Sequence, residues 1–106
     1  MSDNRKHHRK VEVDLPQPFK NISLKVGNTT FPCRAVDASV FGLGLVAEAR
    51  FLSRVSLRET VVLAFDDFQV TAEVLNLAPS YSYNSFRLGV LLDDGPQLVP
   101  YQKLFG

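Results

Sequence analysis

The stretch ISLKVGNTTFPCRAVDASVFG spans residues 22–42 and decides the fold. Apolar and polar residues alternate strictly over residues 22–26, as expected for a half-buried β-strand. Gly27-Asn28 is a turn signal, and the same alternation resumes over residues 31–36. Pro32 cannot donate a hydrogen bond to a neighbouring strand, so we expect an edge or a bulge there. The stretch therefore predicts two antiparallel strands joined by a tight turn.

Short segments with the same period recur along the rest of the chain. They cover residues 43–47, 61–65 and 86–92, and the alternate positions Val70, Ala72, Val74 and Asn76 mark one more strand. Gly95-Pro96 then opens a short helical tail. The pattern predicts an all-β fold, a six-stranded antiparallel β-barrel over residues 11–94 with a helical tail over residues 95–106. Closure of the barrel would remove exposed strand edges.

A basic arm precedes the predicted barrel. Residues 1–10 carry Arg5, Lys6, Arg9 and Lys10 and almost no apolar side chains, so we expect a flexible arm in the free protein. Apolar residues alternate over residues 11–15, which predicts a short strand where the arm meets the barrel. A single domain accounts for the 106 residues.

The composition disfavours several kinds of partner. The formal net charge is only +1, and the ten-residue arm holds the densest local group of basic residues, so a small anion is expected as a ligand rather than a nucleic acid polymer. Cys33 is the only cysteine, which fits a reducing cytoplasm. Its apolar neighbours favour a buried, inert thiol over a nucleophile. The N-terminal charges are not followed by an apolar run, so we expect no signal peptide. No stretch approaches the roughly 18 apolar residues that cross a bilayer, so we expect no membrane insertion.

Two groups of residues have side chains suited to binding a ligand. Arg5 and Arg9 form an R-x-x-x-R spacing, and a guanidinium group matches the oxygens of a phosphate or the O6 and N7 atoms of guanine. Asp37, Ser39 and Gly42 form a D-x-S-x-x-G turn. A carboxylate accepts the N–H donors of guanine, a serine hydroxyl holds a second polar atom or the turn itself, and glycine permits close approach of a ligand. Taken singly, each pattern also fits a solvated arm or an ordinary turn.

Together and in this order, the two patterns resemble the motif of the bacterial PilZ domain family. The resemblance covers nearly the whole chain. Residues 36–43 resemble the family's central strand and turn, and residues 86–90 resemble its late strand, whereas Glu59 stands where many members have a glycine. The resemblance implies a stand-alone cytoplasmic receptor that binds cyclic di-GMP on the outer barrel surface, without catalysis, metal or further cofactor.

The resemblance also assigns roles to the motif residues. It implies that Arg5 and Arg9 hold phosphates and guanine, and that Asp37, Ser39 and Gly42 hold a guanine from the side of the turn. On this interpretation the arm closes over the ligand, and the changed conformation signals to a downstream partner protein.

Three other interpretations compete with this one. The first is a PilZ-like interaction domain that acts on a partner without any ligand. The second is a small barrel that binds RNA or single-stranded DNA, which is disfavoured because the basic residues are densest in the arm and the aromatic residues mostly fall on predicted core positions. The third is an enzyme, which is not expected because no nucleophile–base pair, carboxylate pair or metal cluster has supporting spacing. Arg87 is interpreted as a solvent-facing strand residue, with the ligand face as the alternative.

Overall fold

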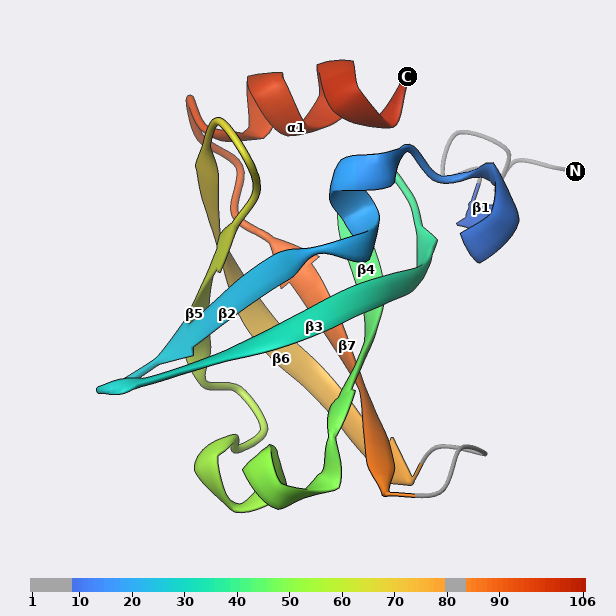
Figure 1. The fold of residues 1–106 in the computed structure, drawn as a ribbon. Coiled ribbons are helices and arrows are strands. Elements are labelled where there is room, and N and C mark those ends of the chain that lie inside the picture. Colours follow the sequence, from blue (N-terminus) through green and yellow to red (C-terminus); the bar gives the residue numbers. More distant parts are fainter. Residues whose placement is uncertain (1–8, 80–83) are drawn as a thin grey trace, which may run out of the picture.

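The computed structural model describes residues 9–79 and 84–106. Its centre is a closed, six-stranded antiparallel β-barrel, as the sequence predicts (Figure 1). The strands are β2 (Ile22–Val26), β3 (Thr29–Ala38), β4 (Gly42–Glu48), β5 (Thr60–Ala64), β6 (Gln69–Pro79) and β7 (Ser85–Leu92). They follow one another around the barrel in the order β3-β2-β5-β6-β7-β4, and pairing of β3 with β4 closes it.

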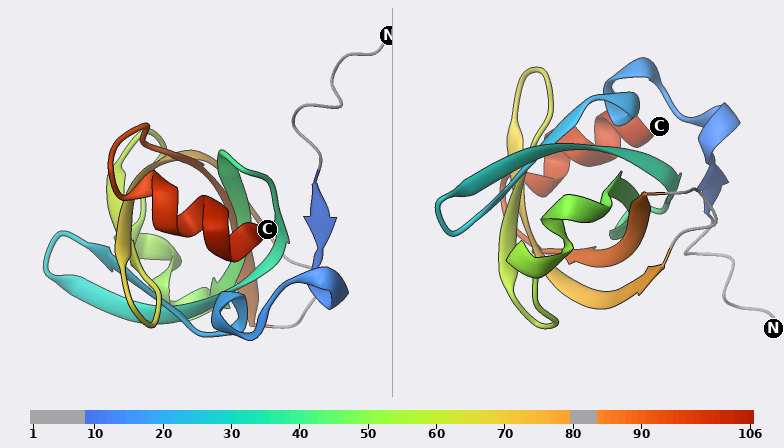
Figure 2. Two further views of the ribbon diagram at one scale, coloured as in Figure 1. Left: turned by 90° about the horizontal axis from the view of Figure 1, so that it is seen from above. Right: turned by 60° about the horizontal axis from the view of Figure 1, so that its bottom comes forward.

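Short helices cover the two ends of the barrel (Figure 2). The C-terminal helix α1 (Leu98–Phe105) lies across one end, and the 3₁₀ helix η4 (Ala49–Arg54) lies at the other. Beneath α1, Tyr101 packs edge-on against Phe19 of the 3₁₀ helix η3 (Gln17–Lys20) and against Phe65, with ring centroids 5.7 and 5.9 Å away. These aromatic rings fill the end of the core, so α1 is part of the fold rather than an appendage.

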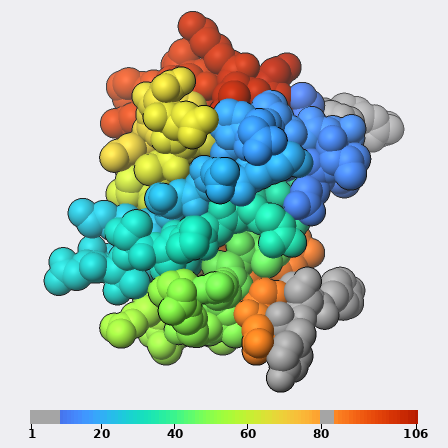
Figure 3. All heavy atoms as spheres, viewed as in Figure 1, coloured from blue at the N-terminus to red at the C-terminus, as the bar shows by residue number. Residues whose placement is uncertain are grey.

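The N-terminal segment joins the sheet for only two residues. Strand β1 (Lys10–Val11) pairs with Asp37 and Ala38, and the 3₁₀ helix η2 (Glu12–Asp14) follows it. The predicted strand over residues 11–15 is therefore wrong beyond Val11. The physical reason lies in β3, because continued pairing would place Glu12 opposite Val36, where the β-bulge between Ala35 and Asp37 interrupts the regular strand. In Figure 3, the blue N-terminal segment packs between the red helix above and the cyan strand below.

Two β-bulges reverse which side chains face outward. Strict alternation from Phe31, Cys33 and Ala35 would turn Asp37 into the barrel, but the register of β3 against β4 shifts between Ala35 and Asp37. Ala38 is buried instead, and Asp37 lies on the outer face. The register of β6 against β7 shifts in the same way between Val74 and Asn76. A bulge inserts one extra residue and re-aims the side chain that follows it.

The expectation at Pro32 is also met. Pairing of β3 with β4 begins only at Cys33, so Pro32 lies just before this ladder starts. The bulge of β3 lies further along the strand, between Ala35 and Asp37. Within the described part of the chain, no helix is long and apolar enough to cross a membrane.

Candidate functional site

The D-x-S-x-x-G segment forms a tight turn between β3 and β4. The backbone N–H of Ser39 donates to the carbonyl of Gly42 at 2.8 Å, and the Phe41 N–H donates to the Ser39 hydroxyl at 3.3 Å. Ser39 is only 4% exposed, so its hydroxyl stabilises the turn. A Cβ atom on Gly42 would lie 3.0 Å from the carbonyl oxygen of Val90. Glycine is required there because backbone of β7 approaches closely.

Two arginines hold the carboxylate of Asp37. Arg9 donates to one carboxylate oxygen, and Arg87 of β7 lies 3.2 Å from the other. Both guanidinium groups are partly open to solvent, as is the carboxylate between them. The three side chains come from the N-terminal segment, β3 and β7, so the closure of the barrel is what brings them together.

Helix α1 supports the turn from inside. The Tyr101 hydroxyl donates to the Ser39 carbonyl at 2.6 Å, and the Gln102 amide donates to the Val40 carbonyl at 3.1 Å. Burial raises the pKa of the Tyr101 phenol well above its usual value, although the nearby Arg9 charge lowers it somewhat. The hydroxyl therefore stays protonated and able to donate at neutral pH.

The N-terminal segment also contacts the far end of α1. The Lys10 ammonium donates to the Phe105 carbonyl at 2.6 Å and lies 4.6 Å from the centre of the Phe105 ring. A cation at the C-terminal end of a helix interacts favourably with its unpaired carbonyl groups. Arg9 and Lys10 are neighbours in sequence, so the site and the helix end are connected by one peptide unit.

Two shallow depressions adjoin the Arg9–Asp37 pair on the outer face of the barrel. The first measures about 500 Å³ and has an apolar wall made by Phe41, Leu75 and Leu91. The second measures about 450 Å³ and is bordered by Asp37 and Arg87. Arg9 and Asn76 are among the residues that line both depressions. Cations, a carboxylate and an apolar wall thus lie side by side on this surface. Such a combination suits a small, charged aromatic ligand.

Most of the residues predicted from the two motifs meet in this region. Arg9 contacts Asp37, and Ser39 and Gly42 line the adjoining depression. Arg5 lies outside the described residues.

Two contributors, Tyr101 and Asn76, were not predicted for this region, and Arg87 was predicted here only as the alternative to a solvent-facing position. Arg87 pairs with Asp37, Tyr101 supports the turn, and Asn76 lies on the outer face. The alternation in its strand predicts that the Arg87 side chain points outward, but it does not predict what Arg87 contacts. The register between β3, β4 and β7 decides which residues meet. For Asn76 the bulge overrides the alternation on which the strand prediction rests.

Neither a family model nor a curated protein matches this chain. The PilZ resemblance therefore rests on the residues quoted above and stays a prediction. Among residues 9–79 and 84–106, no group of three or more His, Cys, Asp or Glu side chains lies close enough to hold a metal ion.

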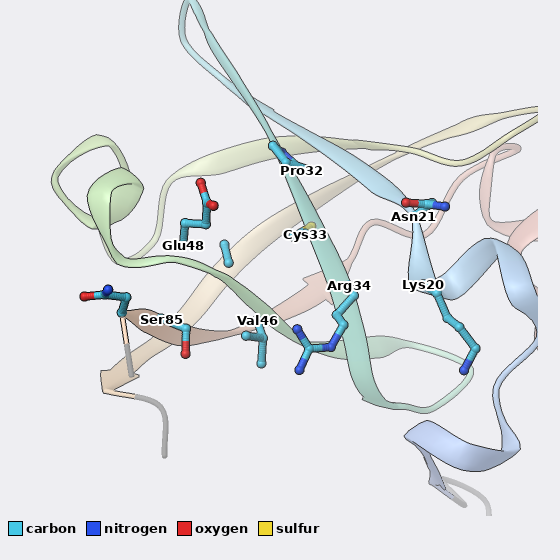
Figure 4. Close-up of a pocket in the computed structure, with 10 residues that line it drawn as sticks. Lys20, Asn21, Pro32, Cys33, Arg34, Val46, Glu48 and Ser85 are labelled. Carbon is cyan, nitrogen blue, oxygen red and sulfur yellow. The ribbon is translucent and has the colours of Figure 1, made fainter. Parts of the chain in front are cut away.

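A further depression of about 430 Å³ lies on the barrel surface beside β3 and β4 (Figure 4). Its lining includes Lys20, Arg34 and Glu48 but none of the residues predicted from the motifs. Arg34 forms an ion pair with Glu12 at 3.1 Å. No arrangement here matches a specific ligand chemistry, so we assign no function to this surface.

Cys33, which borders this depression, is expected to be unreactive in the folded protein. The thiol belongs to the barrel core, and burial raises its pKa to about 12. Compared with a free thiol, the reactive thiolate is then about a thousandfold scarcer near neutral pH. Reaction with Ellman's reagent should be slow in native buffer and fast in denaturant. Rapid labelling of native protein would show that the core opens around β3.

Proposed function

We propose that this protein is a PilZ-like receptor that binds cyclic di-GMP on the outer face of the barrel and signals to a partner protein. The observation that carries the proposal is the contact of Arg9 with Asp37, 28 positions apart, beside the D-x-S-x-x-G turn. The two patterns on which the family resemblance depends are thus neighbours in space. Strand β1 pairs Val11 with Asp37, and this pairing places the arginine of the first pattern beside the aspartate of the second.

The chemistry of the surface suits the chemistry of the ligand. Cyclic di-GMP carries two phosphate charges and two guanine bases. Guanidinium groups bind phosphate oxygens with charge-assisted hydrogen bonds. The Asp37 carboxylate accepts hydrogen bonds only, so it matches the N–H donors of guanine and opposes the lone pair at the same edge of adenine. The apolar wall of Phe41, Leu75 and Leu91 gives a base face a dry surface to contact.

Ligand binding requires an exchange of partners at Asp37. The Arg9–Asp37 pair is partly open to water, and ion pairs near the surface typically contribute only about 1 kcal/mol or less. Transfer of Arg9 from the carboxylate to a phosphate therefore costs little, and it frees one carboxylate oxygen for a guanine N–H. Arg87 remains on the other oxygen and keeps the carboxylate in position.

The same exchange supplies a route for the signal. Lys10 follows Arg9 directly and contacts the end of α1 through Phe105. Movement of Arg9 onto a phosphate would displace Lys10 relative to Phe105. The surface where the N-terminal segment meets α1 would then change. We assign this surface to the partner protein, and cytoplasmic signalling is part of the same proposal.

The proposal is tested by titration calorimetry with cyclic di-GMP on wild type and Asp37→Ala. Loss of the base contact should cost roughly 1–3 kcal/mol, or about ten- to a hundredfold in affinity. The melting temperature should change little because the carboxylate is partly exposed. Affinity of the wild type should also fall with added salt, since phosphate contacts are screened.

Asp67→Ala is the matched control, because this exposed aspartate lies in the turn between β5 and β6 and lines neither depression at the site. GTP and a short oligonucleotide serve as ligand controls. A wild type that does not bind cyclic di-GMP would contradict the proposal and favour a ligand-independent interaction domain. If the wild type binds and Asp37→Ala binds equally well, the carboxylate contacts no base.

A further inference from the structure

Four residues form a straight row across the outer face of the barrel. Asp37 pairs with Gly44, Gly44 pairs with Gly89, and Gly89 pairs with Asn76, so the row crosses β3, β4, β7 and β6. The two polar residues at its ends both follow β-bulges, and without those bulges both would face the core. Bulges that re-aim side chains are over-represented beside functional sites.

Both polar side chains lean over the neighbouring glycine. A Cβ atom on Gly44 would lie 2.7 Å from an oxygen of Asp37, and one on Gly89 would lie 2.6 Å from the amide nitrogen of Asn76. Gly44 and Gly89 add no side chain of their own, so the middle of the row is a backbone platform that the side chains of Asp37 and Asn76 border from either end. Directly opposed positions on paired strands lie about 5 Å apart, so the two polar groups are about 11 Å apart at most.

The Asn76 carboxamide is available for a ligand. It has no hydrogen-bond partner among residues 9–79 and 84–106, and its residue is exposed. A carboxamide offers two N–H donors and one acceptor. Asn76 and Arg9 line both depressions that adjoin the Arg9–Asp37 pair. A ligand in either depression would therefore lie beside the carboxamide.

We infer that Asn76 is a second base-contacting residue, and that one guanine lies on the Gly44–Gly89 platform between Asp37 and Asn76. This inference rests on the proposed function and extends it beyond the two motifs. Asp37 accepts the N–H groups at one edge of the base, and the Asn76 amide donates to the acceptors N7 and O6 at another edge. The upper bound of about 11 Å on the separation of the two side chains is compatible with one purine that makes a hydrogen bond at each end.

The inference is tested with Asn76→Ala and with the side-chain amide signals of Asn76 in ¹⁵N NMR spectra. We expect Asn76→Ala to weaken cyclic di-GMP binding about three- to tenfold, the effect of one net hydrogen bond. The wild-type Asn76 amide signals, identified by their absence from the variant, should shift on titration. Asn28→Ala, in the exposed turn between β2 and β3, is the control and should bind like wild type.

Each outcome decides a different claim. If wild type binds cyclic di-GMP but Asn76→Ala binds within twofold and the Asn76 amide signals do not move, the inference is wrong and the proposed function stands. If wild type does not bind cyclic di-GMP, both fall. If the variant were to lose its fold, the Asn76 amide signals are assigned on wild type from their correlation with the backbone resonances of Asn76, and their shift on titration still decides the inference.

Discussion

Tyr101→Ala is expected to lower the free energy of unfolding by about 3–5 kcal/mol, the usual cost of removing a large buried aromatic side chain. Tyr101 is 0% exposed and fills the end of the barrel between Phe19, Phe65 and Phe105. Urea unfolding followed by circular dichroism measures the loss. The analysis assumes a two-state transition, which small single domains usually show.

Tyr101→Phe separates the hydrogen bond from the packing. The ring stays, but the Ser39 carbonyl loses its donor at 2.6 Å, so we expect a loss of about 1–3 kcal/mol. Val99→Ala is the control on the same helix, because Val99 is 53% exposed and should change stability by about 0.5 kcal/mol or less. A Tyr101→Phe variant as stable as wild type would show that α1 supports the turn by packing alone.

Gly44→Val is expected to reduce the affinity for cyclic di-GMP by about a hundredfold or more, which corresponds to roughly 2.7 kcal/mol. The new side chain would occupy the platform and displace Asp37, whose carboxylate oxygen lies 2.7 Å from the Cβ position. The barrel should remain folded, since valine suits the outer face of a strand and the displaced atoms belong to a partly exposed side chain. Calorimetric titration and the melting temperature report the two effects separately.

Ala64→Val adds the same β-branched group to the outer face of β5, away from the site, and should leave binding unchanged. Gly44→Ala is the milder variant, which displaces Asp37 with a single methyl group, and about a tenfold loss of affinity is expected. If Gly44→Val is folded and binds like wild type, the ligand does not lie on this face of the barrel.

The sequence by itself determined the fold class and the place of the six barrel strands. Period-two alternation reports burial of one face, and turn residues such as Gly27-Asn28 mark where strands end, so both signals are local. The short helix after Gly95-Pro96 is equally local. Arg9, Asp37 and Gly42 were singled out from the two patterns, and their roles as ligand contacts stay predictions that rest on the PilZ resemblance.

Only the tertiary structure decided which residues meet on the outer face. Two β-bulges turn Asp37 and Asn76 outward, against the alternation that predicts the strands correctly elsewhere. The register between β3, β4 and β7 then brings Arg87 to Asp37, and closure of the barrel end brings Tyr101 to Ser39. A bulge and a register depend on how whole strands pair, and the pairing energy is spread over many residues far apart in the chain. No short pattern of residues encodes it.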